Sequence, residues 1–201
     1  MIRLLCATGN PGKLREFRLA AGLAPVEIEL QPGFREIEPC AENGGTFEEN
    51  AAIKALHYGR HSSGLLFADD SGLEVDALSG APGVFSARFS LLSAPAEGPP
   101  LPVDAANNRL LLARLNGVEN RSARFVCAIA LVEDGRLRGA WRGAVEGSIV
   151  HEPRGKGGFG YDPLFYCPQV GCTFGEAGEE QKFAVSHRGQ ALRKMIAALG
   201  A

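Results

Sequence analysis

A short apolar run that ends in two adjacent carboxylates constrains this chain more than any other stretch. Leu65-Leu66-Phe67-Ala68 is followed at once by Asp69-Asp70-Ser71-Gly72. Four apolar residues bounded by turn formers predict a buried strand, with the acids at its C-terminal end. Open α/β sheets bind ligands at that edge, and a divalent cation would neutralise the two acids there. A plain strand-to-turn junction, in which Asp and Ser bond the turn backbone, explains the same residues.

The amino-terminal segment has the order strand, polar loop, helix. Residues 2–7 are apolar except for Arg3, and Thr8-Gly9-Asn10-Pro11-Gly12-Lys13 follows. The spacing of apolar residues then predicts a helix to about Ala21. Amides of such a loop and its lysine can bind phosphate; an ordinary turn with Lys13 in solvent is the alternative. The spacing is not that of a Walker A loop, because Leu14 stands where that motif has Ser or Thr.

Further patterns predict a mixed sheet. Residues 26–30 read as a strand, and Thr46-Phe47-Glu48-Glu49 as a capping box in which Thr46 caps a helix to about His61 and Glu49 returns to it. That helix is predicted to direct Ala51, Ile53, Ala55 and Leu56 inward. Asp104 is predicted to cap a later helix, and Glu133-Asp134-Gly135 to join two strands as a hairpin. Hairpins together with strand-helix alternation favour a mixed α/β sheet.

Three other segments carry chemistry. In Gly157-Gly158-Phe159-Gly160-Tyr161-Asp162-Pro163, glycine amides can surround an anion or a base edge and Phe159 and Tyr161 can stack; a flexible hairpin tip is the alternative. Lys182, His187 and Arg188 surround the start of a predicted helix at 186–199, where Ser186 can act as cap and the helix dipole attracts anions; a solvated helix end would look the same. The proline-rich segment 93–102 is interpreted as a mobile lid or hinge.

Composition excludes several classes of protein. A net charge of −2 and a pI near 6.1 provide no global field to attract nucleic acid or an anionic membrane, and no apolar stretch reaches the roughly 20 residues that span a bilayer. Five cysteines without a CxxC pair favour a reduced compartment over a disulfide framework or a zinc site. We therefore expect residues 1–201 to form a single cytoplasmic domain.

Taken in order, these motifs resemble the inosine/xanthosine triphosphate pyrophosphatase family, also called HAM1-like. The similarity covers nearly the whole chain, including Thr46-Phe47-Glu48-Glu49-Asn50-Ala51 and Gly80-Ala81-Pro82-Gly83. The resemblance implies a two-lobed α/β protein with a long mixed β-sheet flanked by helices and the active site in the inter-lobe cleft. It also implies a homodimer that uses Mg²⁺ to split non-standard purine nucleoside triphosphates (ITP, dITP, XTP) into the monophosphate and pyrophosphate.

The resemblance also assigns roles to residues. Asp70 matches the catalytic, metal-binding carboxylate and Ser71 a substrate contact, and the loop from Thr8 to Lys13 looks like the triphosphate-binding segment. Phe159, Gly160, Tyr161 and Asp162 match the base-recognition loop, with Lys182, His187 and Arg188 as further substrate contacts. Where the family often has Glu-Glu-Thr-Gly, this chain has Ala41-Glu42-Asn43-Gly44, so one acid is missing and Glu42 is expected to be the second metal ligand.

Three rival functions remain at this point. A Maf-like pyrophosphatase would act on modified pyrimidines, but the paired FGYDP and SHR motifs are not expected there. A nucleotide-binding module would bind the same ligand without turnover, and a P-loop kinase lacks support because no Ser or Thr follows Lys13.

Overall fold

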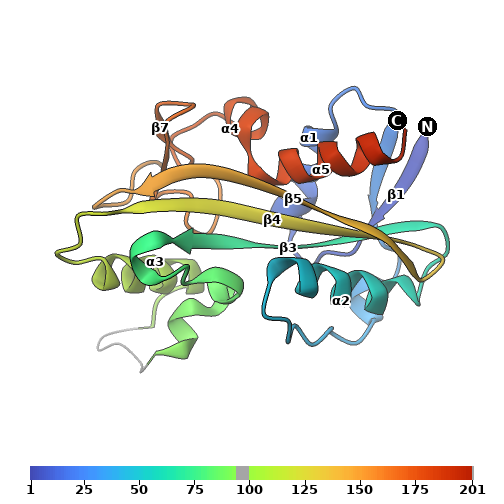
Figure 1. The fold of residues 1–201 in the computed structure, drawn as a ribbon, viewed down its shortest axis with the longest axis horizontal. Coiled ribbons are helices and arrows are strands. Elements are labelled where there is room, and N and C mark those ends of the chain that lie inside the picture. Colours follow the sequence, from blue (N-terminus) through green and yellow to red (C-terminus); the bar gives the residue numbers. More distant parts are fainter. Residues whose placement is uncertain (94–99, 201) are drawn as a thin grey trace. The chain divides into compact units, whose positions relative to one another are not determined.

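The computed structural model describes residues 1–93 and 100–200, and within them seven strands form a mixed sheet in the order β2-β1-β3-β4-β5-β6-β7 (Figure 1). The predicted mixed α/β fold is thereby confirmed. The strands are β1 (Ile2–Cys6), β2 (Val26–Leu30), β3 (Leu65–Val75), β4 (Ser122–Glu133), β5 (Arg136–Ile149), β6 (Phe165–Cys167) and β7 (Cys172–Thr173). The α-helices are α1 (Pro11–Ala21), α2 (Phe47–Gly59), α3 (Val103–Arg114), α4 (Glu179–Val185) and α5 (His187–Ala198).

The chain divides into two compact units. Unit 1 comprises Met1–Ser71, Val126–Ala144 and Phe183–Ala201, and unit 2 comprises Gly72–Phe125 and Val145–Lys182. Strands β3, β4 and β5 each contribute residues to both units. That residues 1–201 behave as one inseparable domain stays a prediction.

In unit 1 the parallel strands β1 and β2 end together, and β1 ends beside Phe67 of β3. Leu4 of β1 pairs with Ile28 of β2, and Cys6 of β1 pairs with Phe67 of β3. The segments that follow β1 and Phe67 are the loop starting at Thr8 and the acids Asp69 and Asp70. The loop after β1 and the two acids of β3 therefore lie at the same end of β1.

Helices cover both faces of the sheet in unit 1. Figure 1 shows α1 and α5 on one face and α2 on the other. Beneath α1 and α5 lies a buried apolar core, in which the rings of Phe17 and Phe67 meet edge to face at 5.2 Å. Its other buried members include Leu4, Cys6, Ile28, Cys127, Ile129, Leu131, Leu192, Met195 and Ile196. Burying a side chain the size of phenylalanine contributes about 1.5–3 kcal/mol, so this face holds the two helices in place.

A glycine of β5 lets α5 approach the sheet backbone. Gly143 is buried, and a Cβ added to it would collide with the carbonyl oxygen of His187, the first residue of α5. The helix start therefore lies directly against β5, and Ser186 caps it by accepting a hydrogen bond from the Gly189 amide at 3.1 Å. The predicted Ser186 cap is confirmed.

In unit 2 an aromatic cluster and a polar network fix the loops. Phe125, Phe165 and Phe174 pack with ring centroids 4.5–5.9 Å apart. Ser86, in the 3₁₀ segment η3 (Gly83–Leu92), donates to the Gly83 carbonyl and accepts from the Leu73 amide. A Cβ on Gly72 would collide with the Ser86 hydroxyl, so η3 can pack here only against glycine.

Several local predictions need correction. Strand β3 does not end at the acids: it continues through Asp69 and Asp70 to Val75, because each carboxylate has partners beside the strand and needs no turn. Thr46 caps α2 as predicted, but Glu49 accepts from the Gly45 amide rather than returning to Thr46. Asp104 is not an N-cap: Pro102 precedes α3 and Asp104 lies in its first turn.

Other local features stand as follows. The Asp134-Gly135 hairpin is confirmed, since both residues have positive φ (48° and 75°) as a tight turn between strands requires. Residues 94–99 of the proposed lid lie outside the described residues. Across residues 1–93 and 100–200 no helix combines the length and apolar character that crossing a bilayer requires, and all five cysteines are free thiols.

Candidate active site

The two adjacent acids of β3 lie on opposite faces of the sheet. Successive side chains of a strand alternate, so Asp69 shares the face of Phe67, beneath α1 and α5, and Asp70 faces α2. The contacts agree: Asp69 accepts from the Lys13 ammonium at 2.8 Å, whereas Asp70 accepts from Lys54 of α2 at 3.1 Å. The sequence suggested one divalent cation shared by both acids. The structure instead gives each acid a lysine of its own.

Electrostatics make the two acids unequal. Burial alone would raise the pKa of Asp69, but the charges of Lys13 and Lys54 outweigh it, so the pKa of Asp69 lies below its usual value. The pKa of Asp70 is instead raised, because burial outweighs the help it receives from Lys54 and from the Asn50 amide at 3.1 Å. Asp69 is thus a fixed anion, and Asp70 is the carboxylate with more to gain from an added cation.

Asp70 and Glu42 meet around one ammonium group. Lys54 Nζ lies 3.1 Å from Asp70 Oδ1 and 3.4 Å from Glu42 Oε1. Burial lowers the pKa of Lys54, and Asp69, Asp70 and Glu42 together more than restore it, so the net shift is upward. The Lys54 ammonium thus contacts both carboxylates that the sequence predicted to be metal ligands.

This donor set fits Mg²⁺. That ion prefers oxygen ligands and is commonly held by one or two carboxylates together with substrate phosphates and water. Asp70 and Glu42 supply two carboxylates beside a lysine that shows the position favours positive charge. Within the described part of the chain no cluster of three His, Cys, Asp or Glu side chains suited to a metal occurs, so the remaining ligands would come from substrate and solvent.

The loop after β1 is organised by Asn10. Its side-chain oxygen accepts from the backbone amides of Gly12 and Lys13 at 2.8 and 3.3 Å. The backbone amide of Asn10 donates to Thr8 Oγ1 at 3.2 Å. Pro11 begins α1, as its fixed φ allows. Two of the amides expected to meet an anion are thus engaged by the Asn10 cap, while the Lys13 side chain, 17% exposed, is within reach of solvent.

At the start of α5 a buried ion pair orients an arginine. Arg188 Nη1 donates to Glu16 Oε2 of α1 at 2.7 Å, and Nη2 donates to Ser71 Oγ at 3.0 Å. Arg188 and Glu16 are only 6% and 4% exposed, and His187 is 1% exposed. The solvated helix end considered above is therefore wrong, and Arg188 is brought to the same strand as Asp70.

In unit 2 the glycine-rich loop forms a closed local structure. Asp162 Oδ2 accepts from the Phe159 amide at 2.8 Å and from the buried Lys182 ammonium at 2.6 Å, and Lys182 lies 5.3 Å from the centre of the Phe159 ring. Tyr161 is 4% exposed and its hydroxyl donates to the Ser86 carbonyl at 2.9 Å. Tyr161 therefore cannot offer a stacking face, and Phe159, which is half-buried, is the aromatic that can.

Sequence reasoning missed three residues of unit 1: Glu16, Asn50 and Lys54. Asn50 and Lys54 are four residues apart on α2, so they share the helix face that Ala51 and Ala55 also help to form. A polar pair at i and i+4 that interrupts an apolar stripe was the available signal. Glu16 had no comparable signal, because it pairs with a residue 172 positions away.

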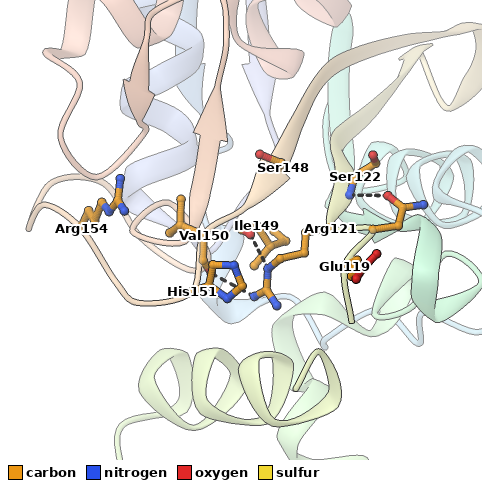
Figure 2. Close-up of a pocket in the computed structure, with 9 residues that line it drawn as sticks. Glu119, Arg121, Ser122, Ser148, Ile149, Val150, His151 and Arg154 are labelled. Atoms are coloured by element: carbon orange, nitrogen blue, oxygen red, sulfur yellow. Dashed lines mark hydrogen bonds between the residues drawn. The ribbon is translucent and has the colours of Figure 1, made fainter. Parts of the chain in front are cut away.

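A separate cavity in unit 2 contains none of the predicted site residues. It measures about 400 Å³ and lies beside Arg121, His151 and Arg154 (Figure 2). Arg121 donates to the carbonyls of Ile149, Val150 and Leu115 at 2.7–3.0 Å. Its charge is thus used to join the start of β4 to the end of β5.

Acids, lysines and an arginine gathered where β1 ends beside β3 are typical of α/β proteins that bind phosphorylated ligands, and paired carboxylates are typical metal ligands. Comparison with known proteins makes the class specific. A family model described as the Ham1 family matches residues 4–198. This chain belongs to the Ham1 family, and the resemblance inferred from its motifs is confirmed.

Individual relatives agree with that assignment. The chain is 48% identical over 199 residues to a dITP/XTP pyrophosphatase of Acidobacterium capsulatum, covering 98% of each chain. It is 48% identical over 198 residues to the protein of the same name from an Exiguobacterium species, covering 98% of this chain and 96% of that one. The structure of a HAM1 protein from Coxiella burnetii is similar with a TM-score of 0.82 and 38% identity, over 100% of this chain and 99% of that one.

Proposed function

We propose that this protein hydrolyses the non-standard purine nucleoside triphosphates dITP, ITP and XTP to the monophosphate and pyrophosphate, and so removes them from the nucleotide pool. The observation that carries the proposal is the arrangement of Asp70, Glu42 and Lys54, with Lys13 and Arg188, at one edge of the unit 1 sheet. The names of full-length relatives at 48% identity supply the substrate class.

We propose that Asp70 and Glu42 hold Mg²⁺, which when bound neutralises phosphate oxygens and polarises the phosphorus. Water attacks the α-phosphorus, the bond from that phosphorus to the bridging oxygen breaks, and pyrophosphate leaves with that oxygen. Asp70 orients the water and accepts its proton, a role that suits a carboxyl group whose pKa is raised by burial. Lys13 and Arg188, together with Lys182, stabilise the charge that develops on the phosphoryl oxygens.

The glycine-rich loop of unit 2 is proposed to recognise the base. Phe159 stacks on the purine, and the remaining residues of the segment, Gly160, Tyr161 and Asp162, hold the loop in shape. A 6-oxo group accepts a hydrogen bond from His187, Arg188 or a loop amide, whereas a 6-amino group would leave such a donor unsatisfied. This difference would separate inosine and xanthosine from adenosine nucleotides. The cleft between two lobes as the place of the reaction stays a prediction.

We further propose that the enzyme is a cytoplasmic homodimer. Five free thiols, three of them buried, suit a reducing compartment. The dimer rests on family likeness, and sedimentation equilibrium at micromolar concentration should give about twice the chain mass of 21.3 kDa.

A substrate panel tests the activity. Pyrophosphate release with Mg²⁺ should be at least about a hundredfold faster in kcat/KM for dITP, ITP and XTP than for dATP or dTTP, since a mismatched polar group at a hydrogen-bonding site is strongly rejected. Chelation of the metal with EDTA should abolish release. Turnover of dTTP would instead favour a Maf-like enzyme, and tight dITP binding without pyrophosphate release would favour a binding module.

Lys13→Met should both weaken binding and slow the reaction. The variant loses the proposed hydrogen bond from Lys13 to a phosphate oxygen of the substrate. A hydrogen bond to a charged group contributes about 1.5–3 kcal/mol, so kcat/KM for dITP should fall about 10- to 100-fold. Arg15→Met, which removes an exposed cation two positions along the same helix, is the matched control and should leave kcat/KM within about twofold. Equal losses in both variants would show that only the general charge of α1 matters.

A further inference from the structure

Helix α3 holds the peptide groups of Gly160 from both directions. The Gly160 amide donates to Asp104 Oδ2 at 2.9 Å, and its carbonyl accepts from Asn108 Nδ2 at 3.0 Å. Asp104 and Asn108 are four residues apart, one turn of the helix, and therefore present both groups on the same face. All three residues belong to unit 2.

The loop needs such support because its own backbone is permissive. Gly155, Gly158 and Gly160 all have positive φ, at 78°, 72° and 61°. Glycine reaches this region without a side-chain penalty, but it also samples many other conformations when nothing restrains it. The two bonds from α3 act at Gly160, which lies between Phe159 and Tyr161, so they restrain the residue next to the half-buried Phe159 ring.

Helix α3 is itself held in place by buried hydrogen bonds from Asn107. Asn107, 2% exposed, donates to the carbonyls of Ser86 and Ala87 and accepts from the Ser90 amide at 2.8 Å. The Tyr161 hydroxyl donates to that same Ser86 carbonyl. Helix α3, η3 and the glycine-rich loop are therefore joined by one continuous set of hydrogen bonds within unit 2.

We infer that Asp104 and Asn108 are positioning residues for purine selection, acting through Gly160 to hold Phe159 where it stacks on the base. The inference rests on the proposed function and deepens it, because it names residues outside the loop that set how well the loop discriminates. Asp104 Oδ2 and Asn108 Nδ2 are both bonded to the Gly160 backbone, so their effect on substrate is indirect.

Steady-state kinetics separate this role from a purely structural one. Asn108→Leu and Asp104→Leu should each raise KM for dITP about tenfold, the effect of about one lost hydrogen bond. The kcat of each variant should stay within about threefold of the wild-type value. The ratio of kcat/KM for dITP to kcat/KM for dATP should decrease in both variants. Asp104→Asn keeps an oxygen that can accept from Gly160 and should restore KM to within about threefold of wild type. Asn116→Leu, an exposed position just beyond α3, is the matched control and should behave as wild type.

Hydrogen exchange of the ligand-free protein supplies a readout that does not depend on activity. Peptides covering residues 155–163 should exchange at least about tenfold faster in Asp104→Leu than in Asp104→Asn or Asn116→Leu. Faster exchange with unchanged KM and unchanged discrimination would overturn the inference while the proposed function stands. Unchanged exchange would overturn it as well, even in a protein that proved inactive on dITP. Should Asn108→Leu not fold, the comparison of the two Asp104 variants decides alone.

Discussion

Replacement of Asp70 by asparagine is expected to abolish dITP hydrolysis while leaving the protein folded. The carboxylate is proposed both to hold Mg²⁺ and to accept the proton of water. Its loss should remove several kcal/mol of transition-state stabilisation, which corresponds to a fall in rate of at least about 10³-fold. Burial raises the pKa of Asp70, so the ionised carboxylate costs free energy in the folded state and a neutral amide of the same shape relieves that cost. The variant also leaves the buried Lys54 without this partner, but Glu42 remains 3.4 Å from the Lys54 ammonium, so the unfolding temperature should fall less than in Glu16→Gln.

The matched control is Asp76→Asn. Asp76 directly follows the same strand and pairs with Arg124 at 2.9 Å, but its side chain is 38% exposed. This variant removes one carboxylate at no proposed ligand position and should keep its rate within about twofold. Near-normal turnover in Asp70→Asn, measured as pyrophosphate release with saturating Mg²⁺, would refute the catalytic assignment. A large fall in unfolding temperature would instead contradict the electrostatic account of that carboxyl group.

Glu16→Gln is expected to produce the largest loss of stability. Removing one partner of a buried ion pair typically costs about 3–5 kcal/mol, because the remaining charge stays in a poorly solvated position. Here the remaining charge is the Arg188 guanidinium, which is 6% exposed and would lose the carboxylate that it contacts at 2.7 Å. In a chain of this size each kcal/mol lowers the unfolding temperature by about 2–4 °C, so a fall of roughly 6–20 °C follows.

A surface pair of the same geometry provides the control. Arg3 Nη2 contacts Glu29 Oε2 at 2.6 Å, but the two side chains are 61% and 35% exposed. Glu29→Gln should leave the unfolding temperature nearly unchanged, because solvent screens exposed ion pairs. If thermal unfolding showed equal losses for Glu16→Gln and Glu29→Gln, burial would not be what gives the Glu16–Arg188 pair its value.

Sequence patterns predicted the sheet well because its signals are local. The β1–loop–α1–β2 order, the Thr46 cap and the Asp134-Gly135 turn all depend on residues close together in the chain. The extent of β3 was predicted wrongly for the opposite reason. Two acids and a glycine usually mark a strand end, and only lysines from α1 and α2 make it possible for the strand to continue.

The structure brings together some of the side chains that the sequence predicted for the site. Motifs brought forward Asp70, Ser71, Lys13 and Arg188, and the structure places these around one strand. Lys54 was overlooked because hydrophobic periodicity treats a charged residue as solvent-facing, while this lysine has two carboxylates beneath α2. The stacking role of Tyr161 was overestimated because a sequence cannot distinguish a ring that faces ligand from one that anchors a loop through its hydroxyl.

Gly143 has a consequence for how natural and engineered variants of this chain should be judged. Its lack of a side chain sets how deeply α5 is seated against β5, and that depth fixes the distance over which Arg188 reaches Ser71. A single added methyl group would displace the whole amino-terminal turn of the helix, and with it the arginine. A survey confined to charged and polar positions would overlook a residue with no functional group at all, whose change nevertheless moves Arg188 relative to Ser71.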